Sequence, residues 1–99
     1  MLPVVRFDPR DDALAHVNAS RSANGSSIFT ESGAVARRYR HDCDAGMIGV
    51  NTGLISHDVA PFGAVKQSGI GREGSNYGIE EYLDVKDVCI GGLTRAVNT

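Results

Sequence analysis

Residues 51–75 of this chain read NTGLISHDVAPFGAVKQSGIGREGS, a long segment in which glycines recur and no helix or strand period is visible. Long connections without regular structure are uncommon in compact domains and often carry function. The segment therefore predicts a functional loop, and the elements on either side of it indicate the fold to which that loop belongs.

Upstream of the loop, apolar runs that suit strands alternate with helical patterns. Strands are expected over residues 2–7, 26–30 and 47–50. Helices are expected from Pro9 to about Ala19 and from Thr30 or Ser32 to about Ala45, with a turn over residues 20–25. This β-α-β-α-β order predicts an α/β fold with a largely parallel sheet. Two helices cannot cover both faces of such a sheet, so we expect neighbouring chains or domains to cover part of it.

Capping residues and apolar faces define the two helices. Asp8 is a favourable N-cap for the first helix, which is expected to bury Ala13, Leu14 and Val17. The second helix is expected to present one apolar face and to end at Gly46. That face consists of Val35, Tyr39 and Cys43.

After the loop, the pattern predicts a short helix, a final strand and a tail. Ser75 or Asn76 is a candidate cap for the helix, whose apolar face would hold Ile79, Tyr82 and Leu83. Residues 85–90 alternate apolar and charged side chains, which is typical of a strand with one exposed side. Residues 94–99 are expected to be frayed.

The composition is that of a soluble chain of at most one domain. Of the 99 residues, 41% are hydrophobic and 22% are charged, and the formal net charge is -2. Neither this charge nor the scattered aromatic residues favours binding to nucleic acid. A chain of this length buries only about 60 to 65% of its unfolded surface, so it is expected to be marginally stable alone.

The termini and the cysteines predict a cytoplasmic protein. The first residues lack the charged leader and apolar core of a signal peptide. No apolar run approaches the roughly 18 residues of a membrane span, so no membrane partner is expected. The only cysteines are Cys43 and Cys89, which favours reduced thiols, with a single bridge between them as the alternative.

A sequence signature within the loop resembles a known family. It consists of Pro61-Phe62-Gly63, Lys66, Ser68-Gly69 and Gly71-Arg72-Glu73. It is similar to the late signature of the aldehyde dehydrogenase superfamily, Pro-Phe-Gly-Gly-x-Lys-x-Ser-Gly-x-Gly-Arg-Glu, and departs from it at Ala64. Residues 46–56 and 77–83 resemble the succinate-semialdehyde dehydrogenase branch in particular.

The resemblance implies the C-terminal part of an aldehyde dehydrogenase catalytic domain over residues 1–84, followed by an oligomerisation strand and tail over residues 85–99. In relatives, that strand joins a homo-oligomer. The family oxidises a small-molecule aldehyde with NAD or NADP, by means of a covalent cysteine and a glutamate that activates water. Those residues and the cofactor domain lie upstream in relatives. The resemblance therefore implies a fragment without catalytic or cofactor-binding residues, inactive alone.

Two loop positions match residues that line the substrate passage in relatives. Phe62 resembles a phenylalanine that stands in the aldehyde tunnel and excludes water, with a core phenylalanine as the alternative. Ser56 resembles a serine that in succinate-semialdehyde enzymes helps hold the distal carboxylate of the substrate, with an ordinary loop serine as the alternative. The two cysteines do not resemble the catalytic Gly-Gln-x-Cys motif, and both are expected to be small buried hydrophobes.

The remaining signature residues are expected to be structural. Polar side chains in a long loop often satisfy backbone groups, and this is the expected role of Lys66, Ser68, Arg72 and Glu73. Positive φ or close backbone approach is the expected reason for Gly63, Gly69, Gly71 and Gly74. If position 64 requires a positive φ, Ala64 would cost about 1 kcal/mol.

Other patterns do not support a site. Residues 69–74 match the dinucleotide fingerprint Gly-x-Gly-x-x-Gly, but no buried strand precedes them. Residues 56–58 read Ser-His-Asp, yet consecutive side chains diverge and cannot form a triad. Residues 41–44 include metal-ligand types that point about 100° apart on a helix, so no metal site is expected. Ion pairs along this helix are expected instead, Arg38 with Asp42 and Arg40 with Asp44.

Three hypotheses follow from these observations. The leading one is the C-terminal segment of an NAD(P)-dependent aldehyde dehydrogenase that oxidises succinate semialdehyde. The second is a free-standing assembly or regulatory module that pairs with a full-length relative through residues 85–90. The third is a small nucleotide-binding domain that uses Gly69 to Gly74.

Overall fold

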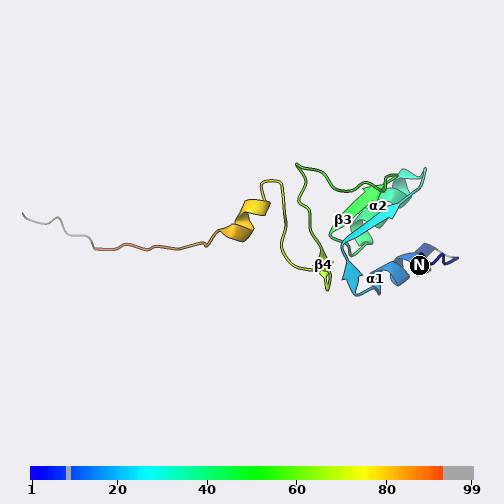
Figure 1. Cartoon of the computed structure of the whole chain (residues 1–99), viewed down its shortest axis with the longest axis horizontal. Helices are drawn as coiled ribbons and strands as arrows, with labels where there is room; N and C mark the ends of the chain where they lie inside the picture. Colours follow the sequence, from blue (N-terminus) through cyan, green and yellow to red (C-terminus); the bar gives the residue numbers. More distant parts are fainter. Residues whose placement is uncertain (9, 93–99) are drawn as a thin grey trace, which may run out of the picture.

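The computed structural model describes residues 1–8 and 10–92 (Figure 1). The elements along the chain are α1 (Arg10–Asn18), β1 (Ser22–Ala23), β2 (Gly25–Ile28), α2 (Gly33–Asp42), β3 (Met47–Val50), β4 (Val65–Lys66) and the 3-10 helix η1 (Gly78–Tyr82). Helices and strands alternate through the first half, and a long loop with one short strand fills most of the second. This mixed architecture confirms the predicted α/β class.

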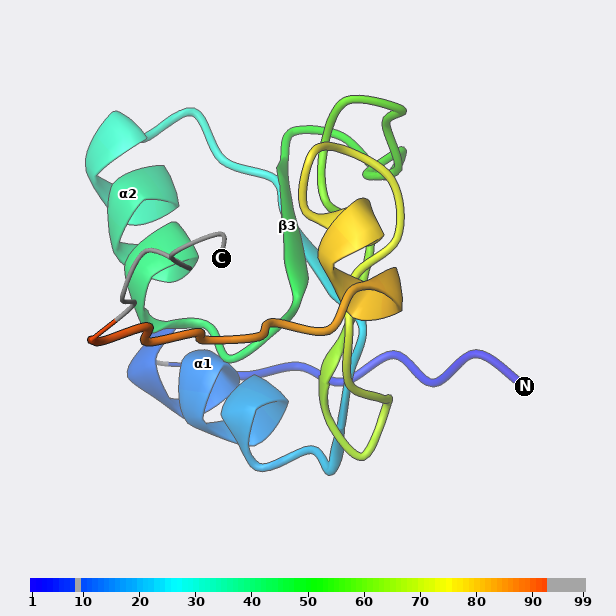
Figure 2. The ribbon, with the colours of Figure 1, turned by 90° about the vertical axis from the view of Figure 1, so that its left-hand side faces the viewer.

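The central sheet is a parallel pair formed by β2 and β3. Its register runs from Gly25 opposite Met47 to Ile28 opposite Val50. A second, antiparallel pair joins β1 to β4, which places the middle of the long loop against the segment just before β2. In Figure 2, α2 lies on one side of the parallel pair, and the long loop with η1 lies on the other. The sheet therefore carries the loop on one of its faces.

The strand predicted over residues 2–7 is wrong for this structure. Residues 1–7 form no regular element, and Val4, Val5 and Phe7 are exposed. A strand requires a neighbour that satisfies its backbone groups, and no described segment pairs with residues 2–7. The second strand starts one residue earlier than expected, and β1 occupies part of the predicted turn over residues 20–25.

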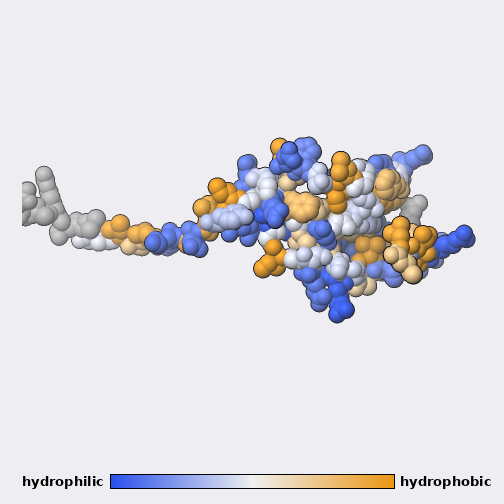
Figure 3. Space-filling model, viewed as in Figure 1, coloured by the Kyte–Doolittle hydropathy of each residue, from blue (hydrophilic) through white to orange (hydrophobic). Residues whose placement is uncertain are grey.

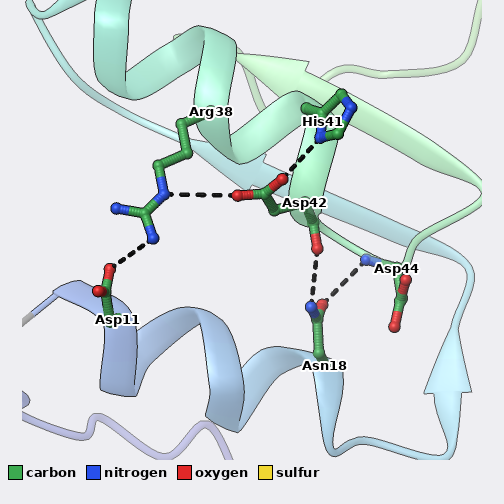
Figure 4. Close-up of polar contacts among 6 residues, drawn as sticks. All are labelled: Asp11, Asn18, Arg38, His41, Asp42 and Asp44. Atoms are coloured by element: carbon green, nitrogen blue, oxygen red, sulfur yellow. Dashed lines mark hydrogen bonds and ion pairs between the residues drawn. The ribbon is translucent and has the colours of Figure 1, made fainter.

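Both predicted helices are present, with differences at their ends. Ser32 is the N-cap of α2, and its hydroxyl accepts a hydrogen bond from the Val35 N–H at 3.4 Å, as expected from the sequence. The helix ends at Asp42 rather than near Gly46. The side chain of Asn18 explains the early end, because its Nδ2 donates to the Asp42 carbonyl at 2.8 Å and its Oδ1 accepts from the Asp44 N–H at 2.9 Å (Figure 4).

The apolar faces of the helices are only partly covered. The predicted face of α2 is confirmed, since Cys43 is buried at its end and Val35 and Tyr39 are half-buried. On α1, Leu14 is half-buried, but Val17 is exposed, contrary to the sequence prediction. None of the described helices is long and apolar enough to cross a membrane.

The C-terminal elements are shorter than predicted. The short helix is the 3-10 helix η1, which begins at Gly78. Its N-cap residue is Tyr77 rather than Ser75 or Asn76, and the Ser75 hydroxyl accepts a hydrogen bond from the Tyr77 N–H at 3.2 Å. Residues 83–92 leave it as an extended arm that forms no strand, so the predicted strand over residues 85–90 is absent (Figure 1). Its backbone has no partner among the described residues. The tail predicted over residues 94–99 lies outside the described residues.

The core is small, and many apolar side chains are exposed to solvent. Only three described hydrophobic residues are buried, namely Ala23, Cys43 and Ala64. Large apolar side chains lie exposed on the folded part and along the arm (Figure 3). The Cα radius of gyration is 22.1 Å, whereas a compact domain of this length has about 13 Å. These surfaces are therefore available for packing against other protein.

Candidate functional site

The sequence signature forms a closed loop, here called the signature loop (residues 61–73). Phe62 and Glu73 form an isolated antiparallel bridge, in which the Phe62 N–H donates to Glu73 at 2.9 Å and the Glu73 N–H donates to Phe62 at 2.7 Å. At the far end of the loop, β4 pairs with β1, and the Gln67 N–H donates to the Arg21 carbonyl at 3.0 Å. The loop is thus fixed at its base and at its tip.

Lys66 and Ser68 attach the signature loop to the first half of the chain. The Lys66 ammonium donates to the carbonyls of Asn18 at 2.7 Å and Ser20 at 3.2 Å, where α1 has just ended. The Ser68 hydroxyl accepts from the Ala23 N–H at 2.8 Å. Both side chains satisfy backbone groups, which confirms the structural role predicted for them.

Arg72 stabilises the base of the loop from inside. Its Nη1 donates to the carbonyls of Ala64 and Gly71, both at 2.8 Å, and its backbone N–H donates to the Glu81 carboxylate at 3.2 Å. The predicted structural role of Arg72 is confirmed. Glu73 contributes through its backbone bridge, and its exposed side chain makes no hydrogen bond to the described residues, so the side-chain role predicted for it is not borne out.

Glycines allow the tight path of the signature loop. Gly69, Gly71 and Gly74 have φ of 137°, 90° and 64°, as predicted. Gly63 serves close approach instead, because a Cβ there would lie 2.5 Å from the Gly71 carbonyl oxygen. Ala64 is buried and does not have a positive φ, so the strain considered from the sequence does not arise.

Gly46 has a different role from the predicted helix terminator. A Cβ at this position would overlap the Gly63 carbonyl and lie 2.7 Å from the Ala64 Cα. Its N–H donates to the Ala23 carbonyl at 3.1 Å. Gly46 therefore allows the backbone of the signature loop to lie directly against the segment that enters β3.

A groove of about 510 Å³ lies beside the signature loop. Its lining includes Phe62, Arg72, Glu81 and Tyr82, and Phe62 keeps 39% of its surface exposed. The described residues therefore do not bury Phe62 as a core phenylalanine. Ser56 is exposed and does not line this groove, so the structure does not bring the two predicted substrate residues into one cavity.

The two cysteines lie apart, and neither has a histidine or carboxylate partner among the described contacts. Cys43 is buried at the end of α2, and Cys89 is exposed on the arm, so the predicted burial of Cys89 is wrong. Both thiols are free. Burial raises the pKa of the neighbouring Tyr39. The hydrogen bond between the hydroxyls of Tyr39 and Ser26 partly offsets this rise. No group of three metal-ligating side chains occurs in the part of the chain that the structure describes.

A polar network joins α1 and α2 (Figure 4). Arg38 contacts Asp11 at 3.0 Å and Asp42 at 3.4 Å, which confirms the predicted pair along α2. A hydrogen bond from His41 and then the Arg38 guanidinium lower the pKa of Asp42. Asp44 faces Lys66 at 3.7 Å, and no pair with Arg40 is found among the described residues. The network is exposed and contributes to helix packing rather than to a site.

Residues 69–74 do not fit the phosphate-binding turn of a dinucleotide site. The fingerprint over residues 69–74 would require an α-helix whose N-terminus meets the pyrophosphate. The next element is the 3-10 helix η1, which starts four residues later at Gly78. Two of the glycines in this stretch, Gly69 and Gly71, instead serve the path of the signature loop. A cofactor would therefore be held by residues other than these.

Comparison with known proteins shows the family of this chain. The sequence model described as the aldehyde dehydrogenase family matches residues 1–88. The chain belongs to this family. The family match covers all the elements that hold the signature loop, from α1 to η1.

Individual relatives agree in sequence and structure. The mitochondrial succinate-semialdehyde dehydrogenase of Mus musculus is 48% identical over 93 residues, which are 94% of this chain and 18% of that protein. The 3-sulfolactaldehyde dehydrogenase of Pseudomonas putida is 44% identical over 95 residues, covering 96% of this chain and 20% of that protein. The crystal structure of an NADP-dependent enzyme of E. coli superposes with a TM-score of 0.83 at 41% identity, covering 88% of this chain and 18% of that one. The chain thus spans about a fifth of the length of these relatives.

Sequence reasoning missed two residues at the start of the long loop. Asn51 has a φ of 57° and uses its side-chain amide on the backbone of Thr30. Ile55 packs over Gly25 and Gly49 of the parallel pair. An asparagine directly after a strand was the available signal, because asparagine tolerates the left-handed region and bonds to nearby backbone.

Proposed function

We propose that this chain forms the C-terminal part of the catalytic domain of an NAD(P)-dependent aldehyde dehydrogenase whose substrate carries a distal anionic group. The preferred substrate is succinate semialdehyde, which is oxidised to succinate. The observation that carries the proposal is Ser56, an exposed hydroxyl on residues 52–56, here called the anion loop. No hydrogen bond from this hydroxyl to the described residues is found, so it is available to a ligand.

Two relatives support this substrate class. Succinate semialdehyde carries a carboxylate at the end opposite the aldehyde, and 3-sulfolactaldehyde carries a sulfonate there. Both anions accept charge-assisted hydrogen bonds from a hydroxyl, which are about twice as strong as neutral ones. An enzyme of this class therefore requires a donor at a fixed distance from the reacting carbon, and Ser56 is the donor that we assign.

Phe62 would contribute by excluding water from the passage. Its backbone is fixed by the bridge to Glu73, and its ring lies partly exposed on the groove beside the signature loop. An apolar ring at this place lowers the access of water to the reacting aldehyde. The structural role of Lys66, Ser68 and Arg72 is to hold this ring and its loop in position.

The chain alone is proposed to be inactive. Oxidation of an aldehyde in this family uses a nucleophile, and neither the buried Cys43 nor the exposed Cys89 has a base beside it among the described contacts. NAD or NADP would accept the hydride in the complete enzyme, held by residues elsewhere. The part of the reaction assigned to this chain is to orient the distal group and to exclude water.

The arm would provide subunit contacts in the complete enzyme. Residues 84–92 are extended and show no backbone hydrogen bond to the described residues, and Val85, Val88 and Ile90 are exposed on them. An unpaired extended segment with apolar side chains is suited to add to the sheet of another subunit. This supports a homo-oligomer, and it also fits the second hypothesis of a module that pairs with a full-length relative. We further propose that the boundary between the catalytic-domain part and the oligomerisation segment lies after residue 84. We also propose a cytoplasmic location.

A chimeric enzyme tests the proposal. Residues 1–99 replace the matching segment of the Mus musculus succinate-semialdehyde dehydrogenase, and NAD(P)H formation is followed with succinate semialdehyde and with butanal, which lacks the distal anion. We expect kcat/KM to be at least about tenfold higher for succinate semialdehyde, the lower end of what one charged hydrogen bond contributes. Equal values would refute the substrate class. Turnover by the isolated chain above background would refute its inactivity.

A further inference from the structure

The residue directly before the anion loop is an asparagine, Asn51, and its side chain continues the pairing of β2 with β3. The backbone register ends at Ile28 opposite Val50, and the Asn51 N–H donates to the Ile28 carbonyl at 2.8 Å. The side-chain amide then takes the place of the next peptide group. Its Oδ1 accepts from the Thr30 N–H at 2.8 Å, and its Nδ2 donates to the Thr30 carbonyl at 3.0 Å. Both polar ends of the amide thus bind one backbone residue.

The backbone of Asn51 can turn away from the sheet because the side chain has replaced it. Its φ of 57° lies in the left-handed region, which asparagine and glycine tolerate better than other residues. The turn continues at Thr52, whose hydroxyl accepts from the Leu54 N–H and donates to the Leu54 carbonyl, both at 3.2 Å. The amide therefore sets the direction in which the anion loop leaves β3.

The other end of the anion loop is held by Ile55. A Cβ at Gly49 would lie 2.6 Å from Ile55 Cγ2, and one at Gly25 would overlap Ile55 Cδ1. The Ile55 side chain therefore packs where only glycine on both strands leaves room for it. Ser56 follows directly. The position of Ser56 therefore depends on two contacts. Asn51 holds the segment where it leaves β3, and Ile55 holds it directly before Ser56.

We propose that Asn51 is a positioning residue for recognition of the distal anionic group of the substrate. It acts through Ser56 by holding the anion loop to the backbone of Thr30. This inference rests on the proposed function, in which Ser56 contacts the anion. Asn51 itself contacts neither the substrate nor the reacting carbon.

The test uses the chimeric enzyme with substitutions at three positions. Asn51→Gly keeps access to the left-handed φ and removes both amide hydrogen bonds, and Asn51→Ala also disfavours that φ. Asn76→Ala is the matched control, since Asn76 is exposed and the structure shows no hydrogen bond from its side chain to the described residues. Ser56→Ala is made alone and together with Asn51→Gly. The measurements are kcat and KM for succinate semialdehyde and for butanal.

Asn51→Gly is expected to raise KM for succinate semialdehyde on the order of 10- to 100-fold, because the anion-binding hydroxyl is misplaced. Asn51→Ala should raise it further. The kcat/KM for butanal and the kinetics of Asn76→Ala should stay within about twofold of the parent. In the Ser56→Ala background, Asn51→Gly should add no more than about twofold, since both act on the same contact.

Each contrary result has a distinct meaning. An unchanged KM in Ser56→Ala would overturn the proposed serine contact and this inference with it. A raised KM in Ser56→Ala beside an unchanged KM in Asn51→Gly would overturn the inference alone. Equal losses with both aldehydes, or failure of both Asn51 variants to fold, would show a general role in the fold and would also overturn it.

Discussion

Replacing Gly46 with alanine should release the signature loop from the sheet. The Cβ of Gly46→Ala would overlap the Gly63 carbonyl and lie 2.7 Å from the Ala64 Cα. Both obstacles are backbone atoms, so no side-chain rotation can relieve the contact. Either the segment that enters β3 or the base of the signature loop must move.

The size of the effect follows from the cost of excess packing. Inserting a methyl group into a filled site costs about 1–3 kcal/mol, and a rigid backbone on both sides places this case toward the upper value. If the strain is relieved when the signature loop opens, opening becomes about 5- to 150-fold more frequent. The matched control is Gly33→Ala, because a Cβ at Gly33 has no atom within 4 Å. As the first residue of α2, it should be neutral or slightly stabilising.

Hydrogen exchange of the chimeric enzyme, followed by mass spectrometry, measures this opening directly. The informative amides are those of Phe62, Gln67 and Glu73, whose hydrogen bonds close the base and tip of the signature loop. We expect faster exchange for peptides that cover residues 61–73 in Gly46→Ala and no change in Gly33→Ala. Identical exchange in the two variants would refute the close approach described for Gly46.

Further expected outcomes concern other parts of the chain. Arg72→Lys in the chimera should lose at least one of its two carbonyl contacts and reduce the stability of the signature loop by about 1–3 kcal/mol, measured by the same exchange experiment. The lowered pKa of Asp42 means that its carboxylate stabilises the fold above the unfolded pKa of about 4, and that this contribution is lost as the pH falls through the folded value. The difference in unfolding midpoint between the parent and Asp42→Asn should therefore shrink as the pH is lowered below about 5, and a constant difference would contradict this. In the isolated chain, Cys89 should react with a thiol reagent in native buffer and Cys43 only in denaturant, so equal labelling rates would contradict the burial of Cys43. Val88→Lys should lower the oligomeric state of the chimera in light scattering, and an unchanged mass would argue against subunit contacts through the arm.

The sequence predicted the elements whose determinants are local. Ser32 caps α2 because its hydroxyl reaches an N–H three residues ahead, and such a contact can be read from spacing. The parallel pair of β2 and β3 follows from the strand–helix–strand order. The strands expected over residues 2–7 and 85–90 are absent because their formation does not depend on local sequence alone. Apolar patterning shows that a segment suits a sheet, but pairing depends on a neighbour, and no described residue supplies one.

The candidate site, like the fold, was predicted from the sequence only in part. The structural role of Lys66, Ser68 and Arg72 followed from the general need to satisfy backbone groups in a long loop. Asn51 was missed because its partner, Thr30, lies 21 residues away and becomes adjacent only when β2 and β3 pair. Its role is a property of the assembled sheet. Patterns within a window of the sequence do not contain such information.

The double attachment of the signature loop has a consequence for the energy of binding. Its hydrogen bonds at base and tip run to partners within the chain, such as Arg21 and Ala23, so the loop is ordered without any ligand. If a loop becomes ordered only on binding, its loss of conformational entropy lowers the affinity for the ligand. Here that entropy has been lost during folding. The contact that we propose between Phe62 and a substrate would therefore contribute fully to binding, and the affinity should depend little on the length or flexibility of the surrounding loop.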